Sequence, residues 1–309
     1  MTITQLQYII AVDTHKHFGR AADACFVTQP TLSMQIQKLE DELGVVIFDR
    51  TKHPIETTAV GKTLIEQARV VISEANKLEQ QAQTASGEIS GEFRLGIIPT
   101  IAGNLLPRFI DAFRNELGDV HLVIEELQTD QIIDALRMEK LDAGILATPL
   151  DEKGIAEIPL YYEPFMAFVP EGHRLANDEF VLSSELDLDD LLLLNKGHCF
   201  RNSVVTLCNQ QADEDRQFRL ESGSFETLIR LSKLGYGMTL LPYLTAIDLP
   251  DDLQPFVKSI AEPTPSREVS IVFNAANAKS AIIDRLGPIV RHGIPKRLLF
   301  EKNTVISPM

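Results

Sequence analysis

Two cysteines and their polar neighbours form the part of this 309-residue chain best suited to chemistry. Residues 197–208 read GHCFRNSVVTLC, which places Cys199 between His198 and Arg201. A thiol attacks as its thiolate, and cationic or hydrogen-bonding neighbours lower the pKa of a thiol toward neutrality. The sequence therefore predicts a reactive thiol at Cys199, with Cys208 as its candidate partner.

The spacing of the two cysteines decides what oxidation would do. If residues 199–208 are helical, a rise of about 1.5 Å per residue separates the two Cα atoms by ~13 Å. A disulfide needs Cα atoms within about 7 Å, so oxidation would have to change the conformation of the segment, as in a redox switch. The segment could instead be extended, and both cysteines could be small buried side chains, as free cysteines usually are.

Cysteine usage and composition narrow the class of protein. The chain is long enough for two or three domains, and its three cysteines are too few and too irregularly spaced for a secreted disulfide framework. The third, Cys25, is expected to be a packing residue. Zinc binding by His198, Cys199 and Cys208 is weakly supported because no Cys-x₂-Cys pair is present. We predict no metal and no cofactor.

Targeting signals are also missing from the pattern. The start, MTITQLQYII, has no basic leader before a long apolar core, and no apolar run reaches the ~18 residues of a membrane span. We therefore expect a cytoplasmic protein with no membrane partner. The net charge of −15 argues against nucleic-acid binding, and residues 1–60 hold five Lys or Arg against seven Asp or Glu. Net charge governs solubility and steering rather than one local surface, so a motif must carry any DNA prediction.

The first 44 residues predict three helices. Apolar periodicity marks residues 5–13 and 18–26, and a third helix is expected between a Thr28 cap and a terminal Gly44. Its predicted buried face consists of Leu32, Ile36, Leu39 and Leu43. Helix, tight turn and a helix with a polar start are typical of a helix-turn-helix that enters the major groove of DNA.

The polar face of the third helix carries groups that read DNA. Gln pairs with adenine, Ser and Thr serve several bases, and Thr or Met methyl groups contact thymine. Phosphate contacts are expected from basic side chains in the wing that follows. The predicted DNA-binding residues are Thr28, Gln29, Pro30, Thr31, Ser33, Met34 and Gln37 on the helix, with Arg50, Lys52 and Lys62 beyond it. The alternative is a three-helix bundle whose polar face meets only water.

A long helix is predicted over residues 58–86. An unbroken seam repeats at spacings of four and three residues: Leu64, Ala68, Val71, Ala75, Leu78, Ala82 and Ala85. Such a heptad seam favours dimerisation, and a dimer matches palindromic half-sites. The helix could instead lie on its own globular domain. A hinge is expected at residues 87–91.

From residue 92 onward, strand and helix patterns alternate. Strands are predicted at 93–98, 120–127, 143–147, 165–169, 191–194, 218–220, 238–241 and 269–273, with helices at 101–117, 130–140, 225–234 and 280–292. This alternation predicts a parallel sheet with helices on both faces. Thr100, Thr129 and Cys199 each follow a strand, and ligands bind at the carboxyl ends of such strands. Each threonine alone could simply cap a helix.

The run FGRAADACFVTQPTLSMQIQKLEDELGVVIFDRT resembles the winged helix-turn-helix of the LysR-type transcriptional regulators, and the resemblance extends over the whole chain. It implies an α/β fold in three parts. These are a winged helix-turn-helix DNA-binding domain at 1–60, a linker and dimerisation helix at 61–87, and an effector module at 88–309 that resembles periplasmic binding proteins. Subdomain I of that module is expected at about 92–163 and 268–300, and subdomain II at about 164–267.

Within that family, GHCFR together with Cys208 resembles the peroxide-sensing members. The resemblance makes Cys199 the peroxidatic thiolate and Cys208 its resolving partner. Thr100, Thr129, His198, Arg201 and Arg267 would form the peroxide pocket. Thiolate attack gives a sulfenic acid that condenses with a second thiol, and hydroxyls and a guanidinium would stabilise the departing hydroxide. Phe200 and Asn202 depart from the Leu and Asp expected in enterobacterial-type sensors, so the pocket's electrostatics should differ.

These patterns together predict a homodimeric or homotetrameric transcriptional activator of peroxide-response genes, rather than an enzyme. Its expected partners are double-stranded DNA, hydrogen peroxide and RNA polymerase. The disulfide would rotate the effector subdomains and change half-site spacing. Two alternatives remain open: a LysR-type regulator that responds to a small metabolite in the effector cleft, and a thiol peroxidase.

Overall fold

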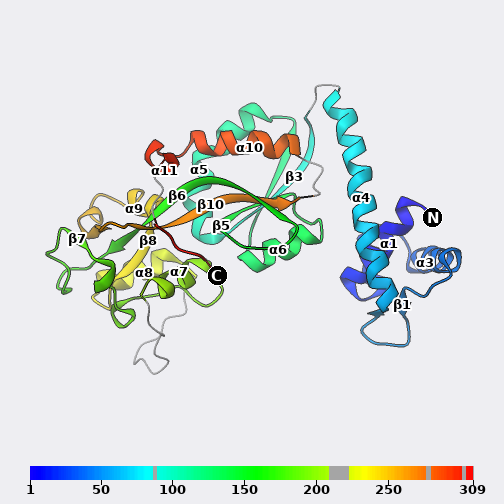
Figure 1. Cartoon of the computed structure of the whole chain (residues 1–309), viewed down its shortest axis with the longest axis horizontal. Helices are drawn as coiled ribbons and strands as arrows, with labels where there is room; N and C mark the ends of the chain where they lie inside the picture. Colours follow the sequence, from blue (N-terminus) through cyan, green and yellow to red (C-terminus); the bar gives the residue numbers. More distant parts are fainter. Residues whose placement is uncertain (86–88, 209–222, 276–279, 301–303, 309) are drawn as a thin grey trace. The chain divides into compact units, whose positions relative to one another are not determined.

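The computed structural model describes residues 1–85, 89–208, 223–275, 280–300 and 304–308 (Figure 1). They fall into two compact units, Met1–Glu88 and Ile89–Ala275 with Ser280–Met309. The strand predicted at 218–220 and the start of the hinge at Gly87 lie outside the described residues. No helix in the described ranges combines the length and apolarity needed to cross a bilayer.

The first unit contains the three predicted helices, α1 (Ile3–His15), α2 (Phe18–Ala24) and α3 (Gln29–Leu43). Thr28 occupies the N-cap position of α3, although its hydroxyl bonds to Thr31 (2.8 Å) rather than to the backbone. Gly44 ends the helix with a left-handed φ of +66°, a conformation that glycine adopts without steric cost. The prediction that Leu43 is buried is wrong, because at this last turn the side chain is 39% exposed.

A short antiparallel hairpin forms the wing, in which β1 (Phe48–Asp49) pairs with β2 (Glu56–Thr57). The long helix α4 (Ala59–Ala85) follows and packs along α1. Ala68 of the predicted seam is buried in the core of this unit, and Leu64 and Val71 pack against that core. Leu78 is 70% exposed. The first half of the seam therefore lies on its own globular unit, and dimerisation by the remainder stays a prediction.

The second unit is built on a mixed sheet. β3 (Gly91–Ile97) runs parallel to β4 (Val120–Glu126) and to β5 (Ala143–Thr148), whereas β10 (Pro265–Asn274) runs antiparallel to β5 and to β6 (Ile155–Phe168). The prediction of a parallel sheet therefore holds for β3, β4 and β5 and is wrong for β6 and β10. Parallel neighbours need a crossover connection, usually a helix; α5 (Pro99–Glu116) connects β3 to β4, and α6 (Thr129–Arg137) connects β4 to β5.

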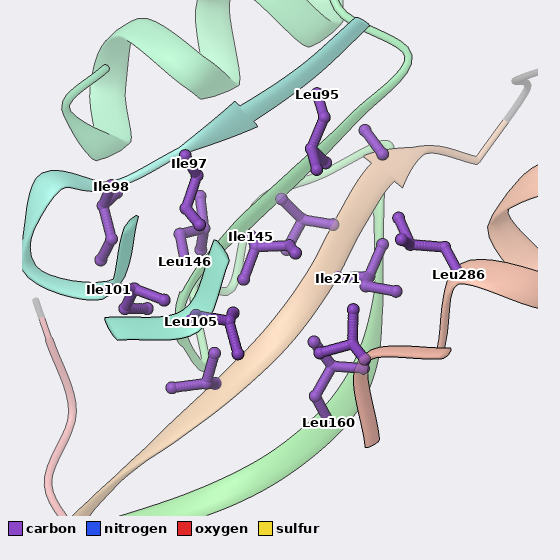
Figure 2. Packing of buried hydrophobic residues seen from close by; sticks show 14 of the residues in the cluster. Leu95, Ile97, Ile98, Ile101, Leu105, Ile145, Leu146, Leu160, Ile271 and Leu286 are labelled. Carbon is purple, nitrogen blue, oxygen red and sulfur yellow. The ribbon is translucent and has the colours of Figure 1, made fainter. Parts of the chain in front are cut away.

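Successive residues of β10 point to opposite faces of the sheet. Ile271 faces α10 (Ser280–His292), since its Cδ1 lies 4.0 Å from where a Gly287 Cβ would stand. On the other face, α6 approaches so closely that a Cβ at Gly144 would lie 2.5 Å from Ile132 and 3.1 Å from Val272. Figure 2 shows the first hydrophobic core of this unit, where labelled side chains from β3, α5, β5, β6, β10 and α10 gather.

Strand β6 leaves this core and enters a second one. Residues 155–164 pair with β10, whereas 165–168 pair with β8 (Thr239–Pro242) and 166–168 with β9 (Val257–Ile260). Among the described residues the strand order is β4-β3-β5-β10-β6-β9-β7, where β7 is Phe180–Val181; β8 lies beside β6, and β11 (Thr304–Val305) lies beside β10. The strand predicted at 165–169 is thus the end of β6. The strand predicted at 191–194 is wrong, because Leu191 makes only an isolated bridge to Met238.

The other described elements belong to the same unit. They are β7 (Phe180–Val181), α7 (Cys199–Leu207), α8 (Phe225–Lys233), α9 (Tyr243–Ile247), α11 (Lys296–Phe300) and β11 (Thr304–Val305), with 3₁₀ turns η1 (Ser183–Glu185), η2 (Leu188–Asp190) and η3 (Gln254–Phe256).

Candidate functional site

The two candidate cysteines lie at the two ends of helix α7. Cys199 is its first residue and Cys208 is its C-cap; both are free, and both are buried. Gly197 turns the chain into the helix with a φ of +109°, and a Cβ there would lie 2.8 Å from the Gln128 side chain. Only glycine fits both constraints. The helical alternative for residues 199–208 is therefore confirmed.

The two thiols pack into different hydrophobic cores. Cys199 belongs to the first core with Ile97 and Ile101, whereas Cys208 belongs to the second with Phe200 and Val204. Helix α7 therefore spans the junction between the cores. A disulfide between its ends requires the helix to unwind and at least one thiol to leave its packing site, because ~13 Å separates the ends of nine helical steps.

Arg267 is the centre of a buried polar cluster, and its positive charge acts on the Cys199 thiol. Its Nη1 donates to the Thr100 hydroxyl (3.1 Å) and its Nη2 to the Thr100 carbonyl (3.0 Å). Its Cζ lies 5.3 Å from the centroid of the Phe200 ring. The structure thus brings together Cys199, Thr100 and Arg267 from segments far apart in the chain, three of the residues that the family resemblance assigned to one pocket.

Glu163 completes the cluster and was missed by the sequence reasoning. Its Oε2 accepts hydrogen bonds from Arg267 Nε (2.9 Å) and Nη2 (2.7 Å), and its Oε1 accepts one from the Leu244 N–H (2.8 Å). Glu163 and Arg267 face each other across β6 and β10. A lone acid within the apolar strand sequence LYYEPFMAFV was the signal that could have found it, since acids are rarely buried unless paired.

Electrostatics at the thiol differ from the prediction. Burial raises the pKa of Cys199 above its ordinary value, and this outweighs the lowering by the Arg267 guanidinium, the Thr129 hydroxyl and main-chain hydrogen bonds at Phe200 and Cys199 itself. The expectation that His198 and Arg201 lower this pKa toward neutrality is wrong for this conformation. The cation that acts on the thiol is Arg267, which comes from β10.

Thr129 is the other hydroxyl beside the thiol. Its oxygen is buried and finds no nitrogen or oxygen partner among the described residues, yet it lies close enough to Cys199 to lower the pKa of that thiol. Neither threonine is a helix cap, so that alternative is wrong. Ile98 caps α5 and Gln128 caps α6, which leaves the hydroxyls of Thr100 and Thr129 inside the first turns.

His198 and Arg201 have different surroundings. His198 is buried at the N-cap of α7, and burial lowers its pKa, which keeps the imidazole neutral near pH 7. Its Nε2 lies 3.4 Å from where a Gly223 Cβ would stand. Arg201 lines a small cavity of the second core with Leu194 and Val204. The contacts of the described residues do not bring Arg201 to the Arg267 cluster.

Cys208 is protonated in this arrangement. Burial first, and the Asp187 carboxylate second, raise the pKa of its thiol to about 11. A thiol with that pKa is a poor nucleophile near neutral pH, so Cys208 must leave its site before it can resolve a sulfenic acid. Among the described residues, no group of three or more His, Cys, Asp or Glu side chains is arranged to hold a metal ion.

The C-terminal segment fastens the first turns of α7. Ser203 Oγ donates to the carbonyl of Cys199 (3.3 Å) and lies 3.4 Å from that of Ser307. Asn202 Nδ2 donates to the Pro308 carbonyl (3.4 Å). Ile306 N–H donates to the Ser266 carbonyl (2.8 Å), next to Arg267 in the sequence of β10. Unwinding of α7 therefore has to break contacts with residues 307 and 308.

The predicted DNA-binding face is largely free. Thr28, Gln29, Pro30, Met34, Gln37, Lys52 and Lys62 are exposed, and Thr31 and Ser33 are half-buried. Arg50 is exposed but already engaged, because its Nη2 donates to Glu40 (2.8 Å) and its guanidinium lies over the Phe18 ring. Glu40 also accepts the Ile47 and Phe48 N–H groups. Arg50 therefore braces the wing against α3 while it faces solvent.

Comparisons with known proteins match both units. Residues 3–62 match the bacterial regulatory helix-turn-helix protein, lysR family, and residues 86–292 match the LysR substrate binding domain. A hydrogen peroxide-inducible genes activator from Pectobacterium carotovorum subsp. carotovorum is 37% identical over 292 residues, which cover 94% of this chain and 96% of that protein.

Solved structures agree with the sequence relatives. Full-length OxyR from Pseudomonas aeruginosa, solved as a point variant, has a TM-score of 0.76 and 35% identity, and the match covers 94% of this chain and 98% of that one. An H2O2-bound OxyR variant from Corynebacterium glutamicum has a TM-score of 0.62 and 28% identity, with 94% and 92% covered. The chain belongs to the LysR family of bacterial helix-turn-helix regulators, in the group that includes OxyR.

Proposed function

We propose that this protein is a transcriptional activator that senses hydrogen peroxide through Cys199 and Cys208. Peroxide oxidises Cys199, a disulfide with Cys208 follows, and the resulting change in the effector module alters DNA binding. The relatives' names support the substrate and the output. The observation that carries the mechanism is the placement of two buried thiols at opposite ends of one helix and in two different cores.

The first chemical step is attack of the Cys199 thiolate on one peroxide oxygen. The S–O bond forms as the O–O bond breaks, and the departing hydroxide takes a proton to become water; sulfur is oxidised and peroxide is reduced. Thr100 and Arg267 supply hydrogen bonds to the leaving oxygen, which stabilises developing negative charge in a site that excludes water. Thr129 lies on the thiol side of this pocket, and buried His198 directly precedes the thiol in the sequence.

The second step joins the sulfurs and drives the switch. The sulfenic acid makes Cys199 larger and polar inside an apolar core, which destabilises its packing and favours unwinding of α7. Release of Cys208 into solvent lets its pKa return toward the ordinary value, so that it attacks the sulfenic sulfur and expels water. The disulfide then holds a conformation in which the two cores are joined differently.

The output is carried by α3 and by assembly of several chains. The exposed side chains of α3 read base edges, and Lys52 and Lys62 contact phosphates. A homodimer or homotetramer presents paired copies of α3 to two half-sites, and the change in effector modules changes their spacing. The protein acts in the cytoplasm, makes contact with RNA polymerase on the promoter, and is a regulator rather than a peroxide-consuming enzyme.

A titration of the full-length reduced protein with substoichiometric peroxide tests this function. Thiols are counted after each addition, and operator DNA is footprinted in parallel. We expect two thiols to be lost per peroxide and the footprint to change in proportion. A Cys25→Ser variant is the matched control and should respond as the wild type does. Loss of thiols with a constant footprint, or a reaction no faster than that of free cysteine, would contradict the proposal.

A second candidate function rests on a cavity of about 570 Å³ that opens next to Thr100. Its lining includes Asn104, Glu226, Thr245 and Asp248, and its volume lies in the range that binds small molecules. A regulator that reads a metabolite there would change its footprint without oxidant. Retention of the full response in a Cys199→Ser, Cys208→Ser variant would favour this candidate over the thiol switch.

A further inference from the structure

The guanidinium of Arg267 has most of its hydrogen-bonding capacity assigned. It carries five N–H groups, and its contacts with Glu163 and Thr100 use four of them. The remaining Nη1 N–H has no partner among the described residues. The Thr100 hydroxyl accepts from Nη1, so its own proton is left to donate. Two donors, one from Thr100 and one from the cation that acts on the thiol, are therefore available to an incoming oxidant.

Glu163 fixes the position of the guanidinium that carries one of these donors. It faces Arg267 directly across the β6–β10 ladder, and its Oε2 accepts from both Nε and Nη2 along one edge of the guanidinium. The carboxylate is itself anchored, because its Oε1 accepts the Leu244 N–H (2.8 Å) at the start of α9. With one edge held by Glu163 and the other by Thr100, the guanidinium cannot rotate.

Stability alone does not account for this ion pair. Both side chains are almost completely buried, Glu163 at 1% and Arg267 at 3% exposure, and desolvating two charges offsets much of their attraction. Replacement of a buried ion pair by a well-packed apolar pair of similar volume is often neutral or stabilising. The pair is explained instead by what it does to Arg267, the cation that acts on the thiol.

We propose that Glu163 is a positioning residue for the peroxide reaction, which holds the Arg267 guanidinium so that its unpaired N–H and the Thr100 hydroxyl reach the leaving oxygen. The inference rests on the proposed function. The negative charge of Glu163 also offsets the positive charge of Arg267. Without Glu163, the Arg267 cation should favour the Cys199 thiolate more strongly, but the N–H donors of Arg267 should be misplaced. Thiolate formation and peroxide activation should therefore respond differently to the same substitution.

The test compares two reactions of the same thiol in the full-length chain, in a Cys25→Ser, Cys208→Ser background that leaves Cys199 alone. Hydrogen peroxide needs the thiolate and a stabilised leaving oxygen, whereas iodoacetamide needs only an accessible thiolate. For Glu163→Gln we expect the ratio of the peroxide to the alkylation rate constant to fall by about tenfold or more, since one misplaced donor at a developing oxyanion costs at least this much. A purely structural role would change both rate constants together.

The matched control is Glu157→Gln. Glu157 lies on the same strand and also accepts a main-chain N–H, that of Leu150 (3.1 Å), but the described contacts do not bring it to Arg267. Its ratio should equal that of the background protein. If Glu163→Gln does not fold, Glu163→Asp takes its place, because it keeps the charge and shortens the reach by one methylene.

The outcomes separate this inference from the proposed function. A ratio for the Glu163 variant within about threefold of the background overturns the inference, since lost donors at oxyanion sites cost more than this; a larger fall supports it. If the background protein itself has no higher ratio than free cysteine, then the peroxide function fails and the inference falls with it. A background acceleration that survives Glu163→Gln overturns the inference alone.

Discussion

Cys199 and Cys208 occupy the two ends of helix α7, and each is buried in a different hydrophobic core. The reduced state is therefore stabilised by packing of both thiols, and the disulfide is incompatible with the helix that separates them. Formation of the disulfide therefore requires loss of this packing, and in this way a local chemical reaction produces a change of conformation.

Replacing the resolving thiol should trap the first intermediate. In Cys208→Ser, peroxide should convert Cys199 to a sulfenic acid that persists, because no second thiol is available to condense with it. Mass spectrometry should show a gain of one oxygen, and a sulfenic-specific probe should label Cys199. The footprint should stay that of the reduced protein. Rapid disulfide formation with Cys25 in this variant would contradict the assignment of Cys208.

The Thr100 hydroxyl should matter for rate rather than for folding. Thr100→Val keeps the shape of the side chain but removes both the acceptor for Arg267 Nη1 and the donor to the leaving oxygen. The rate constant for peroxide should fall roughly tenfold or more, with the thermal unfolding temperature nearly unchanged. The control is Thr264→Val, which removes a hydroxyl that donates to the Ile260 carbonyl; this variant should react with peroxide at the wild-type rate. Unchanged kinetics for Thr100→Val would remove Thr100 from the pocket.

Stability should fall as the pH rises from about 9 toward 11. The Cys208 thiol has an ordinary pKa of 9.0, and in the folded protein burial raises its pKa to about 11. Between these values the unfolded chain has lost a proton that the folded chain keeps, so rising pH favours unfolding. Below the ordinary value the contribution is fully present. Thermal melts across this range should fall less steeply for Cys208→Ser than for the wild type; equal slopes would show that Cys208 titrates normally.

Base-reading and phosphate-binding residues should be separable by salt. Gln37 is exposed on α3, and Gln37→Ala should relax base preference at one operator position by about 1–3 kcal/mol. Lys52 is exposed in the wing, and Lys52→Ala should weaken binding to all sequences and reduce the salt slope by about one. Binding isotherms on operator variants at several salt concentrations measure both effects. If the two variants behaved identically, the assignment of Gln37 to base reading and of Lys52 to phosphate binding would be wrong.

Local sequence patterns were sufficient to predict most of the helices and strands. The spacing of apolar residues on α3, its end at Gly44 and the alternation of strand and helix after residue 92 are properties of neighbouring residues, so they are legible in the chain. The order of the strands in the sheet cannot be predicted from such local patterns. The antiparallel placement of β10 between β5 and β6 depends on which surfaces meet, and the long strand β6 joins two cores that the sequence pattern divided into separate pieces.

At the site, the sequence by itself determined that Cys199 and Cys208 are too far apart to join across a helix, and that a histidine adjoins the first of them. Tertiary structure decided which charges the thiol meets. Arg201, only two residues away, lines another cavity, whereas Arg267 and Glu163 reach the site from β10 and β6. Burial then raises the pKa that the neighbours were expected to lower. Desolvation and long-range pairing depend on the packed fold, and no local sequence pattern contains them.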